Sequence, residues 1–208
     1  MLILCVKHSG NVLLISVEYS LEEGKSNRGN KAVNTIRTKR LILRPFRESD
    51  YDDLYEFLSQ LENDEFEGYP GITYENGREH LKYRIGSEEF FAVEHLASGK
   101  VIGNIYCGGR DFNGREVGYI INQNYRRMGY AREALSAVIG NAFREGAHRV
   151  FAECDPRNIC SWRLLEKAGL RREAHFRRNI YFHTDENGAP KWKDTFVYAM
   201  LRDDLRHL

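Results

Sequence analysis

Arginines surround a glycine in the stretch NYRRMGYAREAL, which covers residues 124–135. Gly129 has no side chain, so the chain can turn sharply there and a ligand can approach the backbone closely. A helical pattern follows directly, and the first N–H groups of a helix are unpaired and carry partial positive charge. Together with the side chains of Arg126, Arg127 and Arg132, these amides would suit a phosphate or pyrophosphate group. The plain alternative is a basic surface in contact with solvent.

The stretch does not match the two most familiar phosphate-binding loops. It lacks the second glycine and the Lys-Ser/Thr pair of a nucleoside-triphosphate loop, and it lacks the three glycines of a dinucleotide fingerprint. Nucleoside triphosphates and nicotinamide dinucleotides are therefore poor candidates for the ligand.

The charge of the chain is nearly balanced. Lys and Arg number 31 and Asp and Glu number 30 among 208 residues, so the formal net charge is +1. No global field attracts such a protein to DNA or to an anionic membrane, and a basic site must be local. The longest apolar run, MLILCV, is too short to span a membrane and lacks the preceding basic residues of a signal peptide. We expect a soluble cytoplasmic protein.

The cysteines do not form a metal-binding pattern. Cys5, Cys107, Cys154 and Cys160 show no C-x-x-C spacing and no paired histidine motif. We therefore predict reduced thiols and no metal site.

Hydrophobic periodicity predicts one domain over residues 36–208, preceded by an appendage. Residues 1–35 contain a possible hairpin and then a polar, linker-like segment. In the domain, Ser49 and Asp52 are expected to cap a first helix, whose apolar face holds Tyr51, Leu54, Tyr55, Leu58 and Leu61. The other expected helices are 78–85, 129–145 and 161–170, and the expected strands are 40–46, 89–96, 100–108, 115–122, 148–154, 172–182 and 193–201.

The order of these elements predicts a mixed sheet. The three strands between residues 89 and 122 follow one another through short turns, so they are antiparallel. The helix 129–145 connects strands 115–122 and 148–154, and a crossover helix requires two parallel strands. The fold class is therefore α/β (α+β).

Two segments resemble the GNAT acetyltransferases. Arg126-x-x-Gly129-x-Ala131 matches the Q/R-x-x-G-x-G/A signature with which that family binds acyl-CoA. The segment ECDPRNICSWRLLEKAGL, residues 153–170, resembles the strand–helix unit of the Rim-type subgroup, which includes the ribosomal-protein N-terminal acetyltransferases. The resemblance covers residues 38–202. It implies the GNAT fold, with helices on both faces of a central sheet that splays at the cofactor site, and an N-acetyltransferase that uses acetyl-CoA and no metal.

The resemblance also implies which residues hold acetyl-CoA. The pyrophosphate would lie on the loop formed by Arg126, Arg127, Met128, Gly129, Tyr130, Ala131 and Arg132. The pantetheine arm would lie between strands 115–122 and 148–154, where backbone groups near Ile120 and Ile121 would pair with it as a neighbouring strand does. Asn158 matches a family position that bonds the cofactor arm; the alternative is that this asparagine caps the next helix.

Glu116 matches a glutamate that serves as general base in several members of the family. The alternative is an ordinary strand glutamate, because a period of two places Glu116, Gly118 and Ile120 on one face without showing which face it is. Glu65 and Glu67 are further candidates and could form an acidic rim for a cationic substrate.

Ser161 matches the hydroxyl that Rim-type relatives place near the cofactor sulfur as general acid, although it could instead cap its helix. Tyr181 could substitute as the proton donor. An acetyl-cysteine intermediate on Cys160 is conceivable, but the family's usual route is direct transfer in a ternary complex.

The resemblance suggests a protein N-terminus as the acceptor amine, while a polyamine or amino sugar fits the acidic loop residues equally. Lysine-type amines have a pKa near ~10.4 and α-amines near ~7.7 to 8.0, so a general base matters more for the former. In this fold, specificity resides in residues 62–77, 78–85 and 183–192. Both a monomer and a homodimer are compatible with the sequence.

Two other functions compete with the enzyme. The basic segment RREAHFRR would suit a nucleic-acid-binding or ribosome-binding module, since its arginines surround a ring that could stack on a base. These residues are Arg171, Arg172, Arg177 and Arg178 around Phe176. The balanced net charge opposes this function, and outward arginines are common on solvated edge strands. The other possibility is a non-catalytic acyl-CoA sensor on the same fold.

Overall fold

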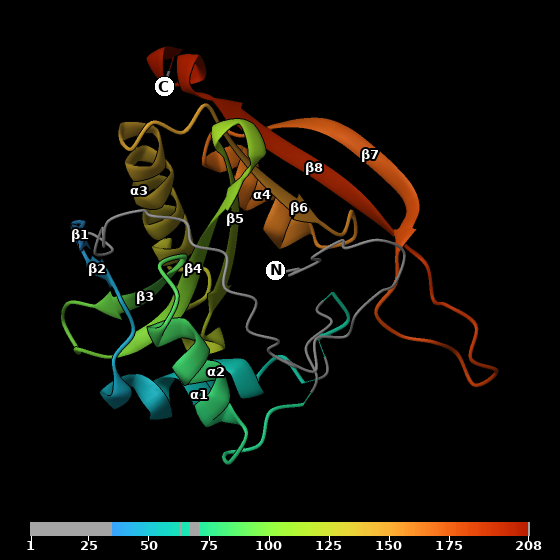
Figure 1. Cartoon of the computed structure of the whole chain (residues 1–208), viewed down its shortest axis with the longest axis horizontal. Coiled ribbons are helices and arrows are strands. Elements are labelled where there is room, and N and C mark those ends of the chain that lie inside the picture. The colour runs from blue at the N-terminus through green and yellow to red at the C-terminus, as the bar shows by residue number, and fades with distance from the viewer. Residues whose placement is uncertain (1–34, 63, 67–70, 208) are drawn as a thin grey trace, which may run out of the picture.

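The computed structural model describes residues 35–62, 64–66 and 71–207 (Figure 1). The predicted hairpin and linker of the N-terminal appendage lie outside the described residues, as does Glu67. In the described part of the chain, no helix is both long and apolar enough to cross a bilayer.

The strands form a single sheet of eight in the order β1-β2-β3-β4-β5-β6-β8-β7. Their bounds are β1 Ile36–Arg37, β2 Leu41–Arg44, β3 Phe90–His95, β4 Val101–Arg110, β5 Gly114–Ile121, β6 Arg149–Cys154, β7 Arg171–Ile180 and β8 Lys193–Leu201. The pair β5 and β6 is parallel, while all other neighbours are antiparallel. The mixed sheet is therefore confirmed, with β1 as a short strand that the sequence did not predict.

Four α-helices cover the two faces of this sheet. They are α1 Tyr51–Ser59, α2 Gly77–Ile85, α3 Tyr130–Arg144 and α4 Ile159–Lys167. One buried cluster joins α1 and α2 to residues of β3, β4 and β5, including Ile120. Two other clusters join α3 and α4 to the opposite face, including Val117 of β5. Helices therefore lie on both faces, as expected, and Figure 1 shows α1 and α2 packed beside each other.

The start of the first helix differs from the prediction. Ser49 and Asp52 do not cap it, because a short 3-10 turn, Glu48–Asp50, precedes α1. The carboxylate of Asp50 accepts the backbone N–H of Arg47 at 2.8 Å and forms a buried ion pair with Arg44. Phe57 is also buried, outside the predicted stripe, because α1 packs against both β4 and α2 and so buries a wider face.

Candidate active site

The gap between β5 and β6 is the central feature of the site. The two parallel strands pair only from Gly114 to Glu116 on β5 and from Arg149 to Phe151 on β6. Beyond Glu116, β5 stays paired with β4 as far as Ile121, and β6 stays paired with β8 as far as Cys154. The strands therefore part in the middle of the sheet, and backbone groups of β5 face the gap.

The ladder between β4 and β5 shows which backbone groups these are. Asn122 donates its N–H to the carbonyl of Ile102 at 2.9 Å, and hydrogen-bonded pairs alternate along an antiparallel ladder. Ile120, two residues earlier, therefore bonds towards β4, opposite Asn104. The backbone groups of Tyr119 and Ile121 point to the gap instead. Of the two predicted residues, Ile121 therefore has backbone groups that face the gap, whereas those of Ile120 bond towards β4. Contact of these groups with the cofactor stays a prediction.

The loop after β5 is anchored on α1. The fully buried Asn122 donates to Glu56 at 2.7 Å and accepts from the side chain of Gln60 at 3.1 Å. Gln60 also accepts the backbone N–H of Gln123 at 2.7 Å. These contacts come from more than 60 residues upstream in the chain, and they tie the loop to α1 where it leaves the gap.

Gly129 makes the turn from this loop into α3. Its φ of 83° lies in the left-handed region that glycine adopts readily, which explains why glycine suits this position. It is the N-cap of α3, and no side chain caps the helix there. The first helical bond runs from the N–H of Glu133 to the carbonyl of Gly129 at 3.1 Å. The N–H groups of residues 129–132 are therefore those that could donate hydrogen bonds to an anion.

The arginines of the loop have different roles in the structure. Arg126 donates its Nε to the carbonyl of Ile121 at 3.1 Å, which ties the loop to the end of β5. Arg127 is exposed and has a φ of 63°, an unusual conformation for a residue with a side chain, and such strain is common at functional sites. Arg132 is exposed on the first turn of α3.

The other predicted loop residues lie at the same turn. Met128 is exposed and Ala131 is half-buried. The hydroxyl of Tyr130 hydrogen-bonds Nε2 of His95 at 3.1 Å, which joins the start of α3 to β3.

Glu116 lies where β5 and β6 part, on the face covered by α1 and α2, since it shares that face with Ile120. Its side chain is 17% exposed and forms an ion pair with Arg110. Burial raises the pKa of Glu116, while the charge and hydrogen bond of Arg110 oppose the rise. A carboxylate with a raised pKa is a better proton acceptor near neutral pH, so this environment suits a general base.

Ser161 approaches the gap from the opposite face. It is buried on the first turn of α4, and its Oγ lies 2.8 Å from the hydroxyl of Tyr119. Tyr119 also donates to the carbonyl of Ser161 at 3.0 Å, so a side chain of β5 reaches across to α4. Asn158 is the N-cap of α4, and its Oδ1 accepts the N–H of Ser161 at 3.0 Å. The structure thus shows the capping role that was the alternative for Asn158, and it shows that Ser161 is not itself the cap.

Two residues of this site, Tyr119 and Arg110, were not singled out by the sequence. Tyr119 could have been found from the period of two, which places it on the face opposite Glu116. No sequence pattern pointed to Arg110, because its side chain is brought to Glu116 by the pairing of β4 with β5.

The remaining catalytic candidates lie elsewhere or form other contacts. The exposed carboxylate of Glu65 lies 3.4 Å from Arg157, which in turn binds the buried Asp155. Cys160 is exposed next to Ser161. The ring of Tyr181 packs edge-on against Trp192, with ring centroids 5.2 Å apart.

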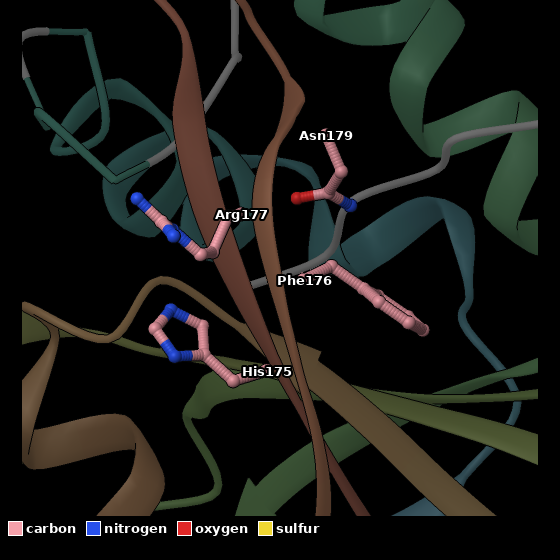
Figure 2. Close-up of a pocket in the computed structure, with 4 residues that line it drawn as sticks. All are labelled: His175, Phe176, Arg177 and Asn179. Carbon is pink, nitrogen blue, oxygen red and sulfur yellow. The ribbon is translucent and has the colours of Figure 1, made fainter.

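The basic segment that would suit a nucleic acid lies on strand β7. Figure 2 shows a pocket on this strand, with His175 and Arg177 on one side and Phe176 on the other. The neighbouring arginines are occupied within the protein, since Arg171 pairs with Asp204 and Arg172 stacks 4.5 Å above the ring of Phe196. These contacts favour the solvated-edge interpretation of the strand.

Comparisons with known proteins agree with this geometry. The model of the GNAT acetyltransferase domain matches residues 40–171. An uncharacterized N-acetyltransferase of Bacillus subtilis, YnaD, is 32% identical over 175 residues, which cover 81% of this chain and 98% of that protein. A GNAT-family acetyltransferase structure from Bacillus anthracis is 28% identical, with a TM-score of 0.74, and covers 82% of this chain and 99% of its own.

A ribosomal-protein α-N-acetyltransferase, RimL, in complex with coenzyme A shares the fold at a TM-score of 0.70 and 17% identity, covering 82% of this chain and 99% of its own. The parted strands and the uncapped helix start define an acetyltransferase of the GNAT fold. The chain belongs to the GNAT family of N-acetyltransferases.

Proposed function

We propose that residues 36–208 form a cytoplasmic enzyme domain that transfers the acetyl group of acetyl-CoA directly to a primary amine, and that the amine is a protein N-terminus. The observation that carries this proposal is the parting of β5 and β6 beyond Glu116, beside a start of α3 that no side chain caps. An extended amide chain fits the first feature, and a pyrophosphate fits the second.

The residues present fit acetyl-CoA at both ends of the gap. The N–H groups of residues 129–132 would hold the pyrophosphate, with Arg127 and Arg132 adding charge. The backbone groups of Tyr119 and Ile121 would pair with the pantetheine amides, while Arg126 keeps the loop in place from the carbonyl of Ile121. Asn158 would hold the start of α4 next to the pantetheine arm, and its contribution would be to orient Ser161.

Glu116 and the pair of Tyr119 and Ser161 flank the gap from opposite faces of the sheet. Bound acetyl-CoA supplies an acetyl thioester between them. Glu116 would take the proton of the incoming amine, directly or through a water, on the α1/α2 side. On the α4 side, the hydrogen-bonded hydroxyls of Ser161 and Tyr119 would deliver a proton towards the departing sulfur. Direct transfer then needs no covalent enzyme intermediate.

A protein N-terminus is favoured by the relatives rather than by a specific contact. RimL is named for acetylating a protein α-amine, and its chain matches this one over nearly its full length. An α-amine needs less help from a base than a lysine-type amine does, because its pKa is lower. A monomer or a homodimer would serve this reaction equally.

A side-by-side acceptor screen tests the proposal. Release of the thiol from acetyl-CoA would be measured with N-terminal peptides, polyamines and amino sugars, with peptides blocked at the N-terminus as the matched control. We expect turnover with free peptide N-termini and none with blocked ones. Turnover confined to polyamines or amino sugars would contradict the proposed acceptor, and binding of CoA without turnover of any amine would favour a sensor.

A further inference from the structure

Arg40 reaches from the start of β2 to the start of α3, about 90 residues further along the chain. Its Nη1 donates to the carbonyl of Met128 at 3.0 Å, and its Nε donates to Glu133 at 2.7 Å. The guanidinium also lies 4.4 Å above the ring of Tyr130. One side chain thus contacts Met128 in the loop and both Tyr130 and Glu133 in the first turn of α3.

The bond to Met128 determines the direction of the next N–H group. In a trans peptide, the C=O of one residue and the N–H of the following residue point in opposite directions. Every described peptide bond is trans. Because the carbonyl of Met128 is turned towards Arg40, the N–H of Gly129 is turned away from it, towards the side where an anion would lie. An anion gains most from a donor that is already aimed at it.

Glu133 keeps the guanidinium in this position. Its Oε1 accepts from the Thr38 hydroxyl at 2.7 Å and from the backbone N–H of Arg40 at 2.8 Å, while Oε2 accepts from Nε of Arg40. Burial works against the charge of Glu133, but these bonds keep its pKa below the usual range. Because the pair is neutral as a whole, its main effect is on geometry rather than on long-range attraction.

We propose that Arg40 is a positioning residue of the cofactor site, which, held by Glu133, orients the peptide between Met128 and Gly129 so that the N–H of Gly129 faces the pyrophosphate. The inference rests on the proposed function, because it assumes that acetyl-CoA binds at the start of α3. The family motif around Gly129 does not include Arg40, which lies far from it in the sequence.

The test compares two acetyl donors that differ at the phosphates. Steady-state kinetics would be measured with acetyl-CoA and with acetyl-pantetheine, which lacks the pyrophosphate, for the wild type, Arg40→Gln and Arg40→Lys. Arg149→Gln is the matched control, because Arg149 of β6 forms a comparable half-exposed ion pair with Glu173 of β7, away from the loop. Thermal unfolding of each variant would be recorded alongside.

We expect Arg40→Gln to raise KM for acetyl-CoA about tenfold, the effect of one misdirected hydrogen bond to a charged group. We expect kcat, and KM for acetyl-pantetheine, to stay within about twofold of wild type. Arg40→Lys should resemble Arg40→Gln, because lysine keeps the charge but lacks the fork that bridges Met128 and Glu133. Arg149→Gln should leave both KM values unchanged.

Three outcomes would overturn the inference while leaving the proposed function intact. They are an unchanged KM in Arg40→Gln, full rescue by Arg40→Lys, and an equal loss with both donors, which would mean a general structural role. If the wild type itself used acetyl-pantetheine as well as acetyl-CoA, the pyrophosphate site would fail, and with it that part of the proposed function.

Discussion

Replacement of Gly129 by valine would test the cofactor loop most directly. The φ of 83° at Gly129 costs a residue with a side chain about 1–2 kcal/mol, and a β-branched side chain is the least tolerant. A Cβ there would also lie 3.3 Å from Nη2 of Arg40, so the guanidinium would have to give way by a few tenths of an ångström. A shift that misdirects two N–H groups would remove two hydrogen bonds to a charged group, each contributing about 1.5–3 kcal/mol. The affinity for CoA should therefore fall about 10²- to 10⁴-fold.

Gly146 provides the matched control for this substitution. It lies just beyond the C-terminal end of α3, has a φ of 97°, and a Cβ there would meet nothing within 4 Å. Gly146→Val therefore carries the same conformational cost without touching the loop. Both variants should unfold a few degrees below wild type, at about 2–4 °C per kcal/mol for a chain of this size.

Isothermal titration with CoA would measure the affinity of each folded variant. We expect Gly146→Val to bind as wild type and Arg132→Ala, at an exposed position, to lose less than about fivefold. Wild-type affinity in Gly129→Val would refute the role of the loop. An equal loss in Gly146→Val would show that the stability of α3, and not the Gly129 turn, controls binding.

The remaining predictions concern proton transfer and the core. Glu116→Gln should lower kcat about 10²- to 10⁴-fold. It should also move the acid limb of the pH–rate profile and the optimum upward, because the raised pKa of Glu116 sets the acid limb in the wild type, whereas without this base only amine that has already lost its proton reacts. Unchanged profiles would exclude Glu116 as the base. Ser161→Ala and Tyr119→Phe should each lower kcat with little change in CoA affinity, and full activity of both would exclude the hydroxyl pair as the acid. Asp50→Ala should destabilise the fold by about 3–5 kcal/mol in urea unfolding, because it leaves Arg44 buried without its main partner; a loss below about 1 kcal/mol would contradict this.

Much of the fold follows from local patterns in the sequence. The apolar residues of α3 recur with the period of a helix, and Ala134, Leu135, Val138, Ile139, Ala142 and Phe143 are all buried. The crossover helix requires β5 and β6 to be parallel, and they are. Gly129 before that helix predicts the turn and the bare helix start. These features depend on residues close together in the chain, which is why a single sequence can specify them.

The chemistry of the site depends on residues that only the tertiary structure brings together. The hydroxyls of Tyr119 and Ser161 are 42 positions apart, and Arg40 and Glu133 are 93 apart. The choice of Tyr119 over Ile120 at the gap depends on the pairing of β5 with β4, which periodicity alone does not reveal. The sequence by itself thus determined most of the elements and the turn at Gly129. The tertiary structure decided which side chains meet around the gap, because contacts between distant residues arise from how the elements pack and not from local pattern.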